Sequence, residues 1–275
     1  ERDTYRYEGA LGAAVLEGVR CGVVRELGCQ GEASELAAHF DHLLVSLRSP
    51  ACGLHFLALN TCDWPEGRTL SELVEALPAR GLKTLVIQSM QVGGALPEAV
   101  AGKCADVEAL YLTNLGLTGS VPARLGKCAK VKVLKLYSNQ LEGPIPDELG
   151  QCVELEALSL SDNRLSGGVP ASLGNCTKLK KLQLFKNHLE GPIPDELGQC
   201  GELELLDLRQ NQLTGCVPAS LDKCTELQRL ALSGNQLEGP IPDELGDGGE
   251  LEALELQKKR RSSFRQLPGV SKDSD

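Results

Sequence analysis

The sequence predicts an α/β solenoid, in which short coils of chain stack side by side and their strands form one parallel sheet. Three observations predict it: a 24-residue period, an LxxLxL motif in each period, and a Val-Pro or Ile-Pro pair after it. Alternate leucines suit a strand buried on one face, and proline cannot donate to a ladder, so the chain must then leave the sheet. One coil could not bury its own leucines, so neighbouring coils must stabilise each other.

The regular coils follow this period without a break, and a looser copy at Leu82 precedes them. Their starts are Val107, Val131, Leu155, Leu179, Leu203, Leu227 and Leu251. The string GPIPDELG recurs in every second coil, at Gly143, Gly191 and Gly239. The unit that multiplied is therefore predicted to be a pair of coils.

An asparagine follows the strand motif in five coils, at Asn139, Asn163, Asn187, Asn211 and Asn235. A buried side-chain amide can bond backbone groups of its own coil and of the next one, which would otherwise lack partners. Met90 and Leu115 occupy the same place in the first two coils, so the asparagine ladder is expected to be broken there.

The pattern LxxLxLxxNxLxGxIPxxLGxC resembles the plant-type leucine-rich repeat of receptor-like kinase ectodomains and polygalacturonase-inhibiting proteins. The resemblance covers residues 82–257. It implies a leucine-rich-repeat horseshoe with the parallel sheet on the concave face and helical, 3-10 or extended turns on the convex face.

The first eighty residues resemble ribonuclease-inhibitor-like repeats, which place a helix on the convex side. The motif LxxLxLxxC runs from Leu54 to Cys62, and TLSELVEALPARG after it has the spacing of an amphipathic helix. A preceding convex helix is expected from Ala33, and a strand near residues 22–27. Residues 1–20 would form an N-terminal cap with a helix in GALGAAVLEGV. The expected domains are thus 1–20 for the cap, 21–81 and 82–257 for the two repeat types, and 258–275 for a polar tail.

Composition excludes several function classes. The 28 basic and 38 acidic residues give 28 − 38 = −10, which argues against a general nucleic-acid or anionic-membrane binder. No run of 18 apolar residues occurs, so no membrane-spanning segment is expected. The oligomeric state is left open.

Cysteines recur every 24 residues at Cys128, Cys152, Cys176, Cys200 and Cys224, and Cys104 stands 24 residues before them but one place later within its own, longer coil. These cysteines could bind metal ions or form disulfides. Buried free cysteine, however, behaves as a small apolar residue, and we expect these thiols to pack in the core in that way. A zinc site is the alternative for the N-terminal set Cys21, Cys29, His39, His42, Cys52, His55 and Cys62. We expect no metal and no cofactor.

No nucleophile, phosphate loop or catalytic dyad has support, so the sequence does not predict an enzyme. The carboxylate pairs Asp147/Glu148, Asp195/Glu196 and Asp243/Glu244 are copies of one turn that returns in every second coil, and charged turns are usually solvated.

The residues between and just after the second and third leucines should face outward on the concave sheet. Phe56, Tyr111, Tyr137 and Phe185 stand at such positions, and basic residues share them. Tyrosine and arginine dominate interaction hot spots. The expected binding residues are Tyr111, Lys135, Tyr137, Lys181, Phe185, Lys186, Arg209 and Arg229. A plain strand preference for aromatics is the alternative explanation.

These features predict a non-catalytic scaffold that binds a protein partner with an acidic segment, or an accessory subunit of a larger assembly. The cysteine column favours a reducing compartment, the cytoplasm or an organelle interior. The alternative is a secreted or cell-surface recognition module, for which Asn175-Cys176-Thr177 is a glycan acceptor triplet. The basic run from Lys258 to Arg261 could be an import patch or a kinase site, but disorder is the ordinary interpretation.

Overall fold

The computed structural model describes residues 5–8, 24–30, 34–60, 63–240, 242, 245 and 253–255. The helix expected in residues 9–19 and the tail after residue 255 lie outside this part of the chain.

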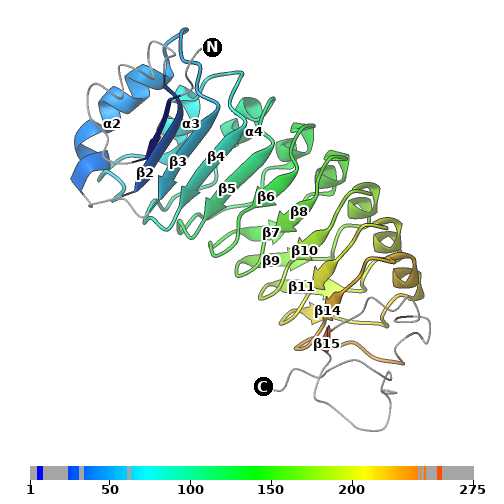
Figure 1. Ribbon diagram of the computed structural model, residues 1–275. Coiled ribbons are helices and arrows are strands. Elements are labelled where there is room, and N and C mark those ends of the chain that lie inside the picture. The colour runs from blue at the N-terminus through cyan, green and yellow to red at the C-terminus, as the bar shows by residue number, and fades with distance from the viewer. Residues whose placement is uncertain are drawn as a thin grey trace.

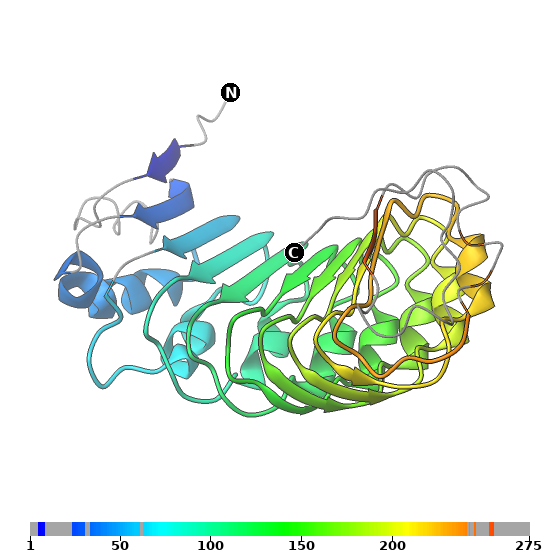
Figure 2. The ribbon, with the colours of Figure 1, turned by 90° about the horizontal axis from the view of Figure 1, so that it is seen from below.

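Coils stack into a shallow arc, and the main sheet lines its inner side (Figure 1, Figure 2). The sheet has eleven strands within the described residues, in the order β1-β2-β3-β4-β5-β6-β8-β10-β12-β14-β15, and all neighbours run parallel. The first five are β1 (Tyr5–Glu8), β2 (Val24–Gln30), β3 (Phe56–Asn60), β4 (Thr84–Gln88) and β5 (Ala109–Thr113). The others are β6 (Val133–Lys135), β8 (Ala157–Ser159), β10 (Lys181–Gln183), β12 (Leu205–Asp207), β14 (Arg229–Ala231) and β15 (Ala253–Glu255).

The outer side changes along the chain from α-helices to 3-10 turns, and the last α-helix lies within residues 82–257. The helices are α2 (Ser34–Leu47), α3 (Leu70–Ala76) and α4 (Ala99–Lys103). The turns are η1 (Ala123–Lys127), η2 (Asp147–Gln151), η3 (Ala171–Asn175), η4 (Asp195–Gln199) and η5 (Ala219–Lys223). Each turn begins directly after a proline, whose fixed φ leads the chain into the turn.

A second parallel sheet, which the sequence did not predict, follows the asparagine positions. Its order is β13-β11-β9-β7, from β7 (Glu142–Pro144), β9 (Arg164–Gly167), β11 (His188–Gly191) and β13 (Gln212–Leu213).

The leucine spine lies between the main sheet and the turns. Leu134, Leu158, Leu182 and Leu206 occupy successive strands in register and are at most 1% exposed. At the N-terminal end, Phe40 of α2 meets the Trp64 ring edge-on at a centroid distance of 5.3 Å. Thr69 and Glu72 form a capping box that fixes the start of α3.

The asparagine ladder joins neighbouring coils as expected. The Oδ1 of Asn163 accepts the Leu141 amide of the preceding coil at 3.0 Å. Its Nδ2 donates to the carbonyl of Leu136 at 3.1 Å, also in the preceding coil, and to its own Leu160 at 3.0 Å. The buried amide therefore satisfies backbone groups in two coils.

Each turn also packs tightly against the next. The glycine of each of the first four turns faces a carbonyl of the following turn, and a Cβ at Gly174 would collide with the carbonyl oxygen of Glu196. In the fifth turn Asp222 takes the place of this glycine, and it is exposed.

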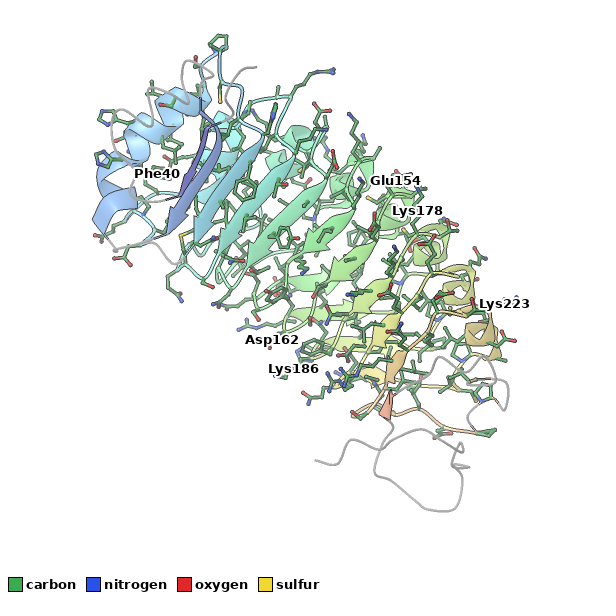
Figure 3. The ribbon with its side chains drawn as sticks, viewed as in Figure 1. Phe40, Glu154, Asp162, Lys178, Lys186 and Lys223 are labelled. Carbon is green, nitrogen blue, oxygen red and sulfur yellow. The ribbon has the colours of Figure 1, made fainter. Side chains whose placement is uncertain are left out.

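Two columns of charge run along the starts of the strands, and we call them the strand-start columns. The first contains Asp106, Lys130, Glu154, Lys178, Glu202 and Glu226, and the second contains Lys83, Glu108, Lys132, Glu156, Lys180 and Glu204. Their signs alternate from coil to coil as far as Glu202 and Glu204. Glu154 and Lys178, 2.7 Å apart, lie side by side at this edge (Figure 3).

Candidate functional site

The eight residues expected to bind all lie on or beside the strands of the concave face, and we call them the concave strip. Tyr111 is on β5, Lys135 on β6, Lys181 on β10 and Arg229 on β14. Tyr137, Phe185 and Arg209 lie two residues past the ends of β6, β10 and β12, and Lys186 follows Phe185.

The aromatic side chains stay out of the leucine spine. Tyr111, Tyr137 and Phe185 are each half-buried, whereas the neighbouring leucines Leu136 and Leu184 are 0% exposed. The rings therefore offer part of their surface to the concave side.

Tyr111 and Lys135 form one unit across two strands. They are paired in the parallel register of β5 and β6, and the Lys135 ammonium lies 5.2 Å from the centre of the Tyr111 ring. Such a contact contributes about 0.5–1 kcal/mol at an exposed site. It orients the lysine over the ring.

Phe185, Arg209 and Asp207 form a second unit. The Arg209 guanidinium lies 5.6 Å from the Phe185 ring centre, and its Nη2 donates to the Asp207 carboxylate at 2.7 Å. Its Nε donates to the same carboxylate at 2.9 Å. Only 5% of the Asp207 side chain is exposed, so the paired arginine is what compensates its buried charge.

Some positions that the sequence placed outward are buried beneath their neighbours. Ser159, Ser161, Thr113 and Asp207 lie on the concave side but are at most 4% exposed. Ser159 and Ser161 share a hydrogen bond at 3.1 Å. In the coil of β8 the sheet therefore carries small side chains at these positions, between the larger ones of β6 and β10.

Lys181 and Lys186 are the exposed cations of the next coil. Lys186 has φ of 53°, in the left-handed region that non-glycine residues seldom adopt. Neighbouring coils repeat this geometry at Asp162 and Gln210, with φ of 56° and 53°. Asp162 and Lys186 lie together at the strand-end edge (Figure 3).

The sequence identified the members of the concave strip but not their pairings. Phe185 and Arg209 hold the same place in successive coils, and this correspondence could have indicated the stacking. The burial of Asp207 leaves no comparable signal in the sequence, because it depends on how Arg209 folds over it.

The cysteine column is buried in the spine. Burial raises the pKa of Cys152 and of Cys200 to about 12, and that of Cys176 to about 11. The Sγ of Cys152 lies 3.4 Å from the Leu125 carbonyl oxygen of the preceding coil, within reach of a weak hydrogen bond. These thiols pack like apolar side chains, as expected.

Within the described residues, no group of three or more His, Cys, Asp or Glu could hold a metal ion. His39 and His42 stack with ring centres 6.2 Å apart. Cys21 and Cys62, of the alternative zinc set, lie outside the described residues. No helix of the described part is both long and apolar enough to cross a bilayer.

The leucine-rich-repeat family models match the regular coils. One described as "Leucine rich repeat" matches residues 177–237, and another described as "Leucine Rich Repeat" matches 130–152 and 154–176. No curated protein sequence matches the chain.

Solved structures with the same fold include plant receptor ectodomains. One is the ectodomain of the receptor kinase GASSHO1/SCHENGEN3 from Arabidopsis thaliana in complex with CASPARIAN STRIP INTEGRITY FACTOR 2. The two chains share 33% identity, and the match covers 91% of this chain and 28% of the receptor chain, with a TM-score of 0.76. The Arabidopsis receptor kinase HAESA, solved with the peptide hormone IDA and the co-receptor SERK1, shares 25% identity and has a TM-score of 0.73 over 92% of this chain and 40% of its own.

A plant ice-binding protein has the same fold as well, with 34% identity and a TM-score of 0.58 over 63% of this chain and 56% of its own. The chain thus spans well under half of the two receptor structures, and one fold serves different purposes. Function must therefore be argued from the concave strip.

Proposed function

We propose that this chain, a leucine-rich-repeat protein resembling plant receptor ectodomains, is a non-catalytic module that binds a protein partner through the concave strip. The observation that carries the proposal is the gathering of partly exposed aromatic rings and cations on one face of a chain with net charge −10. Hot spots of protein interfaces are rich in tyrosine and arginine. Support also comes from the similar ectodomains, which were solved in complex with other polypeptides.

The partner should present an acidic segment to this face. Lys181, Lys186 and Arg229 are exposed there, and Asp207 is already paired with Arg209. Complementary charge steers association and fixes how the two surfaces align.

Replacing Tyr137, Phe185 and Arg209 together by alanine tests the proposal. Partners are captured from the native source on the full chain, and the affinity of each is then measured for the original and the triple variant. Removal of hot-spot side chains should weaken binding by about 3 kcal/mol or more, roughly a hundredfold or greater.

The matched control carries Glu148→Ala, Glu196→Ala and Lys223→Ala on the exposed outer turns, and it should bind as the original does. Unchanged affinity of the triple variant, with an unchanged circular dichroism spectrum, would refute the proposal.

We further propose the secreted or cell-surface setting in place of a reducing compartment, because the similar structures include ectodomains of membrane receptors. Asn175 is exposed at the end of η3, so a glycan could be carried there. The intact mass of the native protein, measured before and after enzymatic removal of glycans, shows whether Asn175 is glycosylated and so tests the secreted setting. An unmodified Asn175 would favour the intracellular scaffold or accessory subunit.

A further inference from the structure

The concave face changes character along the stack. The outward positions of the first three complete coils carry no Asp, Glu, Lys or Arg. These positions are Phe56, Ala58, Asn60, Thr84, Val86, Gln88, Ala109, Tyr111 and Thr113. The basic side chains begin at Lys135 and continue with Lys181 on β10, Arg209 just past the end of β12 and Arg229 on β14. From β3 to β14 the inner face thus passes from an uncharged part to a part in which basic side chains outnumber acidic ones, whereas Glu26 of β2 stands in register with Phe56.

The coil of β8, whose outward side chains are small, marks the boundary between the two parts of the inner face. Tyr137 precedes it and Phe185 follows it in the same column, with Ser161, 2% exposed, between them. β6, β8 and β10 are consecutive in the sheet, so β6 and β10 are about 9.6 Å apart. An extended peptide covers this distance with about three residues.

Lys186 carries a second signal. A lysine is a poor choice for the left-handed region, where glycine or asparagine is less strained. The same left-handed position recurs at Ser89, Asn114, Ser138, Asp162 and Gln210, so the strain belongs to the repeat, and a basic side chain is what distinguishes Lys186 among them. Lys186 is exposed and stands in the same coil as Lys181, with Phe185 beside it.

From these observations we propose that the ligand is an extended, two-part segment, with an apolar residue on Tyr111 and Tyr137 and acidic residues about three positions away, held by Lys181 and Lys186. The inference rests on the proposed use of the concave strip and adds the chemistry and the order of the ligand. Charge complementarity selects an acidic partner: of the two carboxylates beside these lysines, Asp207 is paired with Arg209, and Asp162 accepts a hydrogen bond from Ser138.

Peptide display on the full chain tests this directly. Random dodecapeptides are selected for binding to the original chain. Those that no longer bind the variant with Tyr137, Phe185 and Arg209 replaced by alanine are then sequenced. We expect an apolar residue about three positions from two acidic ones. Strip-dependent binders without acidic enrichment would overturn the two-part ligand but leave the proposed function intact. The absence of any strip-dependent binder would count against both.

A selected peptide then separates binding from folding. Lys181→Gln and Lys186→Gly should each weaken it by about two- to fivefold at low salt, and the loss should shrink at high salt. Gln210→Gly is the matched control for Lys186→Gly, because Gln210 has the same φ of 53° and no charge. Both glycine variants should shift the melting temperature alike, while only Lys186→Gly weakens the peptide. Equal affinity of the two variants would contradict a role for Lys186.

Discussion

Asn163 shows how one side chain can connect two coils. Replacement by alanine would leave the Leu141 amide buried without this partner, whereas the Leu136 carbonyl would still accept from Asn139 at 2.9 Å. Each unsatisfied buried group costs about 1–3 kcal/mol. We therefore expect Asn163→Ala to lower the free energy of unfolding by about 1–3 kcal/mol, measured by urea denaturation. Ser166→Ala, at an exposed position of β9, is the control and should change it by less than about 0.5 kcal/mol.

The buried thiols give a second prediction. At pH 8 iodoacetamide should modify the exposed Cys216 in the native protein but spare Cys152, Cys176 and Cys200, since the thiolate is the reactive form and burial raises their pKa. Peptide mapping after alkylation measures this. Rapid labelling of Cys176 without unfolding would contradict it.

The same thiols make stability depend on alkaline pH. Their pKa values of about 11 to 12 in the folded state lie above the ordinary value of about 8.5 for an unfolded chain. The folded state then holds more protons, so their contribution is fully present below pH of about 8.5 and is lost as the pH rises toward 11 to 12.

At this scale the sequence predicted the asparagine bonds and the inert cysteines, because a regular period places like residues on like neighbours. It could not predict that Ser161 is covered or that Asp207 is enclosed by Arg209. Both depend on the side-chain directions of adjacent coils, which a repeat pattern does not contain.

Among the elements, the turns on the outer side depend on a glycine. Gly174→Ala would force η3 away from η4, because the added Cβ collides with the Glu196 carbonyl. We expect a loss of about 2 kcal/mol or more in urea denaturation. Asp222→Ala, at the corresponding exposed place of η5, should be neutral within about 0.5 kcal/mol. Equal effects of the two substitutions would show that turn packing is not the cause.

The strands of the main sheet and the helix α3 could be predicted from alternation and from the amphipathic spacing of TLSELVEALPARG. α2 lies in the segment expected to be helical, and it ends at Leu47. The second sheet could not be predicted, since segments such as Glu142–Pro144 lack a strand pattern of their own. They become strands only because the coils on either side are already aligned.

For the molecule as a whole, the strand-start columns couple the coils through charge. Asp106 lies 2.6 Å from the Lys130 ammonium, which, with a hydrogen bond from the Gly81 amide, lowers the pKa of the carboxyl to about 2. Because the pKa of this carboxyl is lower in the folded state than the value of about 3.9 in an unfolded chain, its ionisation stabilises the fold above pH of about 4. This contribution to the free energy of unfolding is lost as the pH falls from about 4 toward 2.

The variant Lys130→Met should therefore show a flatter fall in melting temperature between pH 4 and pH 2.5 than the original chain. Lys127→Met, exposed at the end of η1, is the control and should keep the original slope. Parallel curves for the original and Lys130→Met would argue that Asp106 titrates normally.

The overall architecture was predictable because one repeated motif determines strand, turn and stacking direction together. The concave strip was predictable only as a set of positions, since aromatic residues on a strand can serve packing or binding. Its division into two parts is visible only once β6, β8 and β10 are known to be neighbours.

Alternation of sign in the strand-start columns has a consequence for how long such an array can grow. Deleting the single coil that carries Glu154 and Glu156 would bring Lys130 against Lys178 and Lys132 against Lys180, whereas deleting two successive coils there would again bring opposite charges together. Insertion or deletion of coils in this region is therefore favoured two coils at a time, because only then do opposite charges remain neighbours. Electrostatics thus keeps the number of coils even or odd, although each single ion pair is weak.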